Sequence, residues 1–284
     1  MKNKLGPLAS YFGLAFAISW ITWTPGIVIC QAGGGEITSI AGLFILLGAF
    51  GPSAAALIVT GWMEGRVGIV RLLMRLFDWR QPVGWWLIAV FLPAFLLLSS
   101  LGLWTLRGGV MLAFIPARAL ALLLPTLAFV FPFGPLAEEL GWRGFALPRL
   151  QERFSPLVAS LILGTFWTLW HVPVFWAPGV ALSPGPVDLS RVGLYWLSTM
   201  STAALMTWIF NHTRGSVLVM IIFHMMINAT PQILMPAFTG FEQASFAQVN
   251  QIQLLLKWAL VLVIFGGQSA AKWSQRAHQQ QARV

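Results

Sequence analysis

Residues 83–106 read VGWWLIAVFLPAFLLLSSLGLWTL, a stretch that contains no charged side chain. A helix needs about 20 predominantly apolar residues to cross the hydrocarbon core of a bilayer. The rest of the chain has the same character, since 58% of its 284 residues are hydrophobic and only 9% are charged. A soluble domain has about 25% charged residues and could not bury so many apolar side chains. The composition therefore predicts a protein that spans a membrane several times.

Apolar runs of a similar length occur eight times along the chain. They cover residues 11–31, 37–63, 83–106, 119–141, 157–177, 192–210, 216–236 and 252–267. Pro25, Pro93 and Pro125 fall inside three of these runs, where neighbouring helices can satisfy the freed backbone carbonyls. We therefore expect an all-α fold, a polytopic membrane bundle of about eight transmembrane helices.

Lysine and arginine residues gather on one side of these predicted helices. If the N-terminus is inside, thirteen fall in inner segments, three fall in outer loops, and Lys257 lies within the last span. Such an excess marks the cytoplasmic side. We expect an integral membrane protein, of the plasma membrane, with both termini cytoplasmic. The net charge of +9 then serves topology and contact with the lipid bilayer, and no nucleic-acid partner is expected.

Two adjacent glutamates stand out, because an ionisable side chain within a bilayer is costly and tends to be functional. Glu138 and Glu139 lie in the run AEELGWRGF at the end of the fourth apolar stretch. Glu139 and Arg143 are four residues apart with the acid first, which favours an ion pair. Glu138 points about 100° away from that pair, so it could face a cavity and act as a general base. A charge cluster with no catalytic role is the alternative that this run leaves open.

Two histidines lie within predicted spans, His171 in TLWHVP and His224 in IIFHMMIN. Asn228 follows His224 by four residues, so both side chains project from one helix face. An imidazole and an amide on one wall of a cavity could stabilise a developing oxyanion. They could equally bind a metal or hold two helices together.

Straight helices would keep these groups at different depths. At 1.5 Å per residue, His171 is roughly 20 Å from the inner end of its span and His224 is about 12 Å from its own. Glu138 would be shallower still unless the fourth helix continues past Trp142. The candidate groups can meet only if helices tilt, break or end elsewhere.

Three motifs follow one another along the chain, on the fourth, fifth and seventh predicted helices. They are EExxxR (Glu138, Glu139, Arg143), an aromatic residue four before a histidine (Trp167, His171), and HxxxN (His224, Asn228). In this order they resemble the CPBP family of intramembrane proteases, which includes CAAX prenyl endopeptidases and bacteriocin-processing or immunity (Abi) proteins. The resemblance covers roughly residues 115–235. The family usually has Phe at the position of Trp167. The difference keeps an aromatic side chain, so it would alter the shape of the pocket more than its chemistry.

The resemblance implies a hydrolase, an intramembrane endopeptidase acting on a peptide or membrane-protein substrate. Glu138 and His171 would activate water, and His224 and Asn228 would stabilise the tetrahedral oxyanion. Glu139, the fifth candidate catalytic residue, would position the glutamate segment together with its arginine. The arginine and the aromatic residue of the motifs would give structural support.

The resemblance is compatible with a reaction with or without a metal. The family is often labelled a metalloprotease, and His171 and His224 with a carboxylate could bind zinc with an open fourth position. Glu138 and His171 could also work as a base pair without metal. The chain has no HExxH motif, and no aspartate lies in a predicted span. A run of the form GxSA at residues 51–54 is explained more simply by a close helix contact than by a serine nucleophile.

We expect the chain to have three parts. Residues 1–114 would hold the first helices and an amphipathic connector at 66–80, residues 115–236 the catalytic core, and residues 237–284 the last helix and a cytoplasmic tail. The connector is too short and too basic to span, so we expect it on the inner leaflet. A membrane immunity or adaptor protein without catalytic activity is the alternative to the protease.

Overall fold

The computed structural model describes residues 6–34, 38–110, 113–177, 187–239 and 243–281. Lys2, Lys4 and Arg283, which contributed to the charge asymmetry, lie outside the described residues. The described residues form helices and no β-strand, which confirms the all-α prediction. The α-helices are α1 (Gly6–Ala32), α2 (Ser39–Gly48), α3 (Gly51–Met74), α4 (Val83–Leu106), α5 (Pro116–Phe133), α6 (Pro135–Gly141), α7 (Leu147–Gln151), α8 (Pro156–His171), α9 (Leu189–His212), α10 (Val217–Leu234) and α11 (Gln243–Gln281).

Seven segments of the described chain are long and apolar enough to cross a membrane. They are Gly6–Ala32, Ser39–Phe77, Val83–Leu106, Pro116–Gln151, Pro156–Trp176, Val217–Ala237 and Ser245–Gly267. The remaining predicted span, residues 192–210, lies in α9, which is as long as α4, 24 residues, but carries many serines and threonines. Because most of the C-terminal half of α9 is buried, its hydroxyl groups face protein instead of lipid. The expectation of a polytopic bundle of about eight helices is confirmed.

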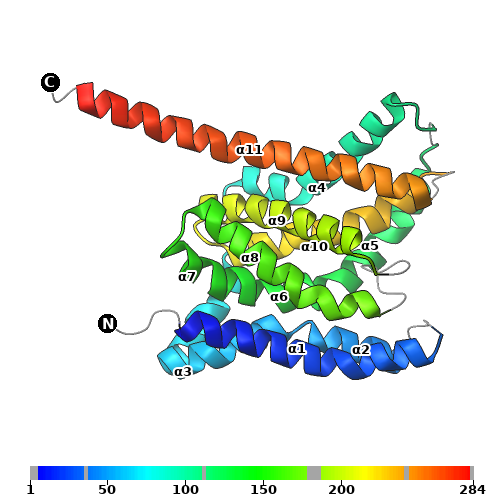
Figure 1. Cartoon of the computed structure of the whole chain (residues 1–284), viewed down its shortest axis with the longest axis horizontal. Coiled ribbons are helices and arrows are strands. Elements are labelled where there is room, and N and C mark those ends of the chain that lie inside the picture. The colour runs from blue at the N-terminus through cyan, green and yellow to red at the C-terminus, as the bar shows by residue number, and fades with distance from the viewer. Residues whose placement is uncertain (1–5, 35–37, 111–112, 178–186, 240–242, 282–284) are drawn as a thin grey trace.

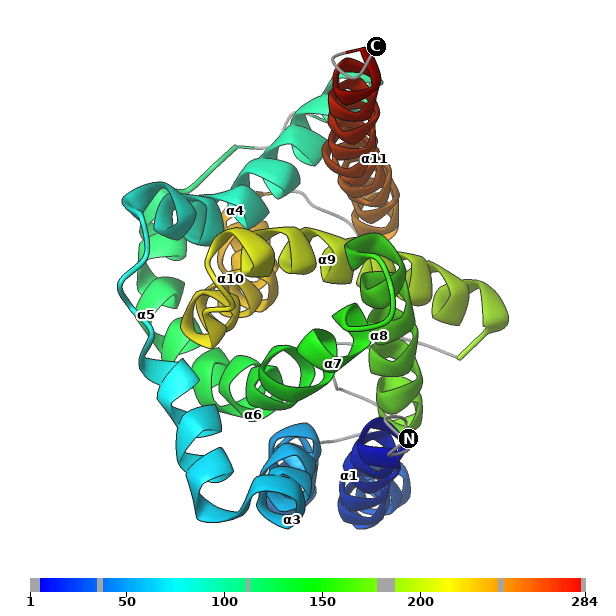
Figure 2. The same cartoon turned by 90° about the vertical axis from the view of Figure 1, so that its left-hand side faces the viewer.

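Helix α10 occupies the interior of the bundle. In the end-on view it lies inside a ring that α4, α5, α6 and α9 form around it (Figure 2), and it contacts each of them. Helices α1, α2 and α3 pack together below this group, and α11 runs across the opposite side (Figure 1). Among the seven candidate spans, the one that carries HxxxN has the largest buried share.

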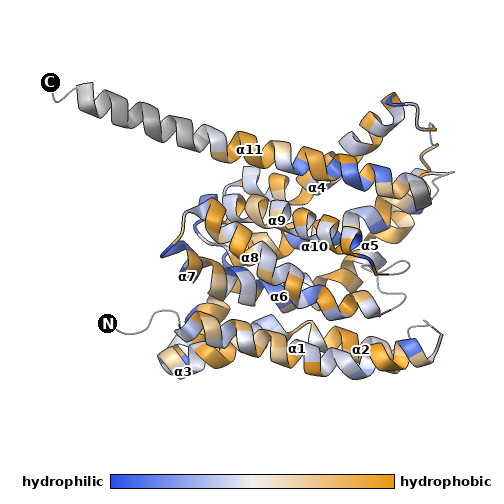
Figure 3. Cartoon of the chain, viewed as in Figure 1, coloured by the Kyte–Doolittle hydropathy of each residue, from blue (hydrophilic) through white to orange (hydrophobic). Residues whose placement is uncertain are grey.

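The outward faces of the peripheral helices are apolar, as a lipid environment requires (Figure 3). On α4, Leu87, Phe91 and Phe95 are 52%, 60% and 65% exposed and follow one another at intervals of four residues. Residues at that spacing share one helix face. A stripe of large apolar side chains on the outside of a helix is costly in water and stable in hydrocarbon.

The fourth span is longer than predicted, and a break and a π-helical turn within it help the candidate groups to meet. The chain breaks at Gly134 between α5 and α6, continues from α6 into a π-helical turn over Trp142–Ala146, and ends with α7 at Gln151. The prediction that this span ends at residue 141 is wrong, because it took the polar run AEELGWR for the membrane surface. Glu138 and Glu139 consequently lie within the span, and π-turns inside helices are frequent at functional sites.

The predicted connector at 66–80 differs in form from the expectation. Residues 66–74 continue α3 after a break at Gly65, whose φ of 63° suits a residue without a side chain. A short 3-10 turn, Arg75–Phe77, follows. The guanidinium of Arg75 donates to the carbonyls of Gly144 at 2.7 Å and Gly215 at 3.3 Å. Arg75 therefore ties this segment to the core instead of lying free on the lipid surface.

Small residues let the N-terminal helices approach the core closely. A Cβ on Gly51 would overlap the side chain of Ser19 on α1, which supports the prediction that the GxSA run is a helix contact. A Cβ on Gly141 would overlap the backbone carbonyl of Pro52 and approach the hydroxyl of Tyr11 to 2.7 Å. Gly141 thus allows α3 to pack directly on the helix that carries the glutamates.

We expect Gly141→Ala to destabilise the protein by about 1–3 kcal/mol, the usual cost of overpacking a well-packed interior. Gly84→Ala is the matched control, since a Cβ on Gly84 would meet no atom within 4 Å. The comparison uses thermal unfolding of both variants in the same detergent. Equal stability of the two variants would show that α3 and α6 are not in this close contact.

Candidate active site

Glu138 is held by two tryptophans. Its Oε2 atom accepts a hydrogen bond from Trp142 Nε1 at 3.2 Å and another from Trp167 Nε1 at 2.7 Å. Trp142 lies four residues further along the same chain segment, while Trp167 comes from α8. The glutamate is 4% exposed. Two indole donors on one oxygen fix the carboxylate in place, since Trp Nε1 is a donor only.

Glu139 makes the predicted ion pair and a second contact that the sequence did not reveal. Its Oε1 atom lies 2.8 Å from Arg143 Nη1 and 2.7 Å from His224 Nδ1. The guanidinium of Arg143 also lies over the ring of Trp167, 4.5 Å from its centroid. Glu139 and Arg143 are fully buried. One network therefore joins residues from all three sequence motifs.

The contact with Glu139 orients the imidazole of His224. A carboxylate accepts hydrogen bonds, so Nδ1 of His224 donates to it and Nε2 is left for another partner. The ring also packs edge-on against Trp167, with centroids 5.1 Å apart. In the protonated ring both nitrogens carry a proton, so Nε2 could donate to an oxyanion while Nδ1 holds Glu139.

His171 lies one helical turn beyond Trp167. Its ring can accept a proton, whereas that of His224 can donate one. Its Nδ1 lies 2.9 Å from the carbonyl oxygen of Trp167. Because a carbonyl only accepts, Nδ1 carries the proton and Nε2 of the neutral ring has a free lone pair. The ring meets Tyr195 of α9 edge-on, with centroids 5.6 Å apart. His171 is thus arranged to accept a proton through Nε2.

Asn228 and Glu138 approach each other across Gly134. A Cβ placed on Gly134 would lie 3.3 Å from Nδ2 of Asn228 and 3.8 Å from Oε1 of Glu138. The missing side chain leaves space between the amide and the free carboxylate oxygen. His171 and Asn228 are only partly buried, so the site is more open on their side than around Glu139.

The structure thus brings together Glu138, Glu139 and His224 with the supporting Arg143 and Trp167, and places His171 and Asn228 next to this network. Sequence reasoning assigned no role to three neighbours of the site: Trp142, Gly134 and Tyr195. Trp142 could have been found from its spacing of four residues from Glu138. Gly134 and Tyr195 gave no such signal, because only the break in the fourth span and the packing of α9 bring them to the site.

The donor set does not fit a three-ligand metal site. Among the described residues, no three His, Cys, Asp or Glu side chains converge as a metal requires. The Nδ1 atoms of His171 and His224 contact a backbone carbonyl and Glu139, so only the Nε2 atoms of these two rings are left to bind a metal. Catalytic zinc usually takes three protein ligands and keeps a fourth position open.

The fold and this network together define an integral membrane protein with a buried Glu/His centre. The chain matches the family of Rce1-like type II CAAX prenyl endopeptidases over residues 119–230. It is also similar to CAAX prenyl protease 2 of Methanococcus maripaludis, with 29% identity over 242 residues, which cover 79% of this chain and 83% of that protein. Both similarities are to CAAX prenyl proteases, the kind of protein that the three motifs resemble.

Trp167 is the position at which the chain departs from the usual phenylalanine. We expect Trp167→Phe to reduce kcat about tenfold or more, because it removes a hydrogen bond to a charged group worth about 1.5–3 kcal/mol. Trp170→Phe is the matched control, since Trp170 Nε1 is buried without a hydrogen-bond partner among the described residues. Equal kcat values for the two variants would rule out a role for the indole of Trp167 in holding Glu138.

Proposed function

We propose that this intramembrane protease cleaves a peptide bond near the C-terminus of a CAAX-type substrate with water activated by Glu138. The observation that carries the proposal is the network in which Trp142 and Trp167 fix one oxygen of Glu138 while its other oxygen faces the space beside Gly134. A carboxylate held in this way keeps its second oxygen available to a water molecule.

In the proposed reaction, one side of the site activates water and the other stabilises the oxyanion. Glu138, assisted by Nε2 of His171, takes the proton of the attacking water. His224 and Asn228 donate hydrogen bonds to the oxyanion that forms from the scissile carbonyl. The proton then passes to the leaving amine, which completes hydrolysis of the bond. Glu139 and Arg143 keep His224 in orientation and have no contact with the substrate.

The class of substrate is proposed from the relatives. Their names describe proteases that act on CAAX prenyl proteins. Such a substrate would present a lipidated cysteine and a short C-terminal peptide, both of which can approach a site within the membrane. We propose further that the protein resides in the plasma membrane with both termini in the cytoplasm, as the charge asymmetry predicts.

The proposed reaction uses no metal, since no three His, Cys, Asp or Glu side chains of the described residues converge. If zinc is required, His171 and His224 are the residues that would hold it. Metal analysis of the purified, active protein tests this point, with less than 0.1 zinc per chain, about a tenth of a full site, as the expected result. One zinc per chain that is lost together with activity on chelation would require a metal in the reaction.

The proposed activity is tested with the purified chain in liposomes. A farnesylated peptide ending in a CAAX sequence is expected to lose its last three residues, detected by mass spectrometry. The same peptide without the farnesyl group, and a peptide with a blocked C-terminus, report what the site requires. Absence of cleavage of all three peptides by folded protein would contradict the CAAX substrate.

A further inference from the structure

Lys257 is a cation in the middle of a membrane span, and the proposed reaction does not use it. It lies within the segment Ser245–Gly267 of α11, roughly 15 Å from either end at 1.5 Å per residue. Lysines near the ends of a span extend their ammonium group to the interface, but Lys257 is too deep to do so. An ionisable group at this depth is costly and marks a functional site.

The partners of Lys257 are all neutral. Its Nζ atom donates to Ser198 Oγ at 2.6 Å, to Thr202 Oγ1 at 3.2 Å and to the carbonyl of Ser198 at 3.3 Å, all on α9. No carboxylate of the described residues forms an ion pair with it. These hydrogen bonds solvate the ammonium group but leave its charge without a counter-ion.

Lys257 also lines a cavity of about 110 Å³ between α4, α9, α10 and α11. A single water molecule needs only about 10–15 Å³ of such space, so the cavity can hold a carboxylate with a few carbon atoms, and the rest of a longer ligand would extend out of it. One side of the wall is apolar and includes Leu96 and Leu97 of α4 and Phe223 of α10. A small polar anion would make no favourable contact with these apolar side chains.

The other side of the wall offers hydrogen bonds. Asn250, Gln253 and Lys257 are separated by three and four residues, so they share the face of α11 that borders the cavity. Thr230 of α10 also lines it, and its buried hydroxyl has no hydrogen-bond partner among the described residues. A buried polar group without a partner costs free energy that a bound acceptor would recover.

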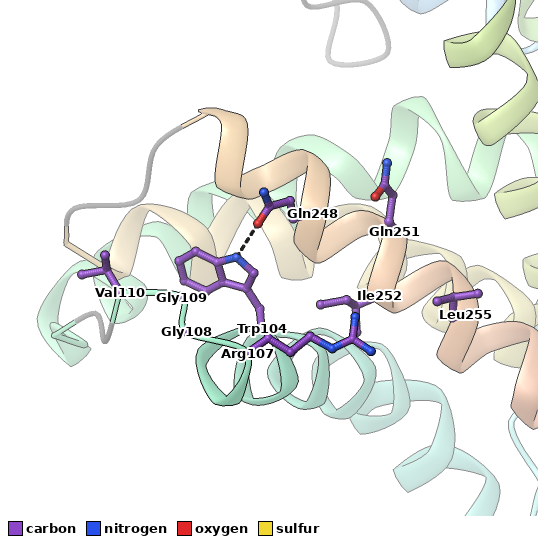
Figure 4. Close-up of a pocket in the computed structure, with 9 residues that line it drawn as sticks. All are labelled: Trp104, Arg107, Gly108, Gly109, Val110, Gln248, Gln251, Ile252 and Leu255. Atoms are coloured by element: carbon purple, nitrogen blue, oxygen red, sulfur yellow. Dashed lines mark hydrogen bonds between the residues drawn. The ribbon is translucent and has the colours of Figure 1, made fainter.

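A second, wider hollow of about 430 Å³ also has a cation on its wall, but Lys257 is the better candidate for binding an anionic ligand. The hollow lies between the end of α4 and the start of α11, where Trp104 Nε1 donates to Gln248 Oε1 at 2.8 Å (Figure 4). The cation on its wall, Arg107, is exposed. Water can solvate Arg107, whereas Lys257 is partly buried and no carboxylate of the described residues forms an ion pair with it.

We infer that the cavity beside Lys257 binds an apolar molecule that ends in a carboxylate. The carboxylate would pair with Lys257 and accept from Thr230, and the apolar part would lie against α4 and Phe223. Two sources share this chemistry, a single-chain fatty acid and the free C-terminus of a hydrophobic peptide. Either ligand would pack against Phe223 and Ile227 of α10. These two residues come directly before His224 and Asn228 in the sequence.

The test uses the full chain in neutral detergent and measures binding by calorimetry. The probes are dodecanoate and the tripeptide Val-Ile-Leu, each compared with its neutral counterpart, methyl dodecanoate and the tripeptide amide. Saturable binding of at least one carboxylate, with the neutral counterpart weaker by about tenfold, is the expected result. Binding of dodecanoate alone assigns the site to a lipid-derived acid, and binding of the tripeptide alone assigns it to a peptide terminus.

Lys257→Gln removes the charge but keeps a donor for Ser198 and Thr202, and we expect it to weaken binding about tenfold. Arg107→Gln makes the same change at the other hollow and should leave the affinity unaltered. The inference is overturned if neither carboxylate binds, if the neutral probes bind as tightly, or if Lys257→Gln binds within about twofold of the original chain. The probe comparison needs no variant and no proteolysis, so its outcome is independent of both the folding of Lys257→Gln and the proposed function.

Discussion

Glu138→Gln is expected to lower kcat for peptide cleavage by a factor of about 10²–10⁴, the usual contribution of a general base. The amide keeps the size of the side chain, and its oxygen can still accept from Trp142 and Trp167. The variant therefore loses the capacity to take a proton without losing its place. Initial rates at saturating substrate measure the effect on kcat directly.

Glu152→Gln is the control for this substitution, because Glu152 is exposed and lies outside the network. It should cleave at the rate of the original chain. A Glu138→Gln protein that folds and retains more than about a tenth of kcat would exclude Glu138 as the base. Thermal unfolding of both variants verifies that any loss is chemical.

Arg143→Ala is expected to destabilise the protein by about 3–5 kcal/mol, because removing one partner of a buried ion pair leaves the other charge uncompensated. Arg143 and Glu139 are fully buried, and their contact is 2.8 Å long. The substitution also removes the cation from the face of Trp167. Reversible unfolding in mixed micelles, followed by tryptophan fluorescence, gives the change in free energy.

The chain supplies its own control in the pair of Arg71 with Glu64. That contact is 3.3 Å long, and the Arg71 side chain is 72% exposed. Exposed pairs contribute at most about 1 kcal/mol, so Arg71→Ala should be nearly as stable as the original chain. Similar losses for Arg143→Ala and Arg71→Ala would mean that the Glu139 network does not stabilise the fold.

The helices could be predicted from the sequence because each membrane span must be apolar over a fixed length. The same rule failed at the fourth span, where the polar run AEELGWR looks like a membrane surface. That run is tolerated inside the span because Arg143 and His224 pair with Glu139 and two indoles bind Glu138. Hydropathy treats residues one at a time, so it does not detect groups that satisfy one another.

The candidate site was predictable where spacing along one helix decides the contact. The pair of Glu139 with Arg143 followed from an interval of four residues and is present. The contact of Glu139 with His224 was not predictable, since 85 residues separate them and only the packing of α6 on α10 joins them. The hydrogen bond from Trp167 to Glu138 likewise depends on how α8 packs.

Comparative peptidomics tests the central claim, that the chain is an endopeptidase whose base is Glu138. Membranes containing the original chain are compared with membranes containing Glu138→Gln at equal abundance, and with membranes that lack the protein. We predict new peptide C-termini with the original chain only, and these termini would identify the substrate. Identical peptides from the original chain and Glu138→Gln would contradict the account.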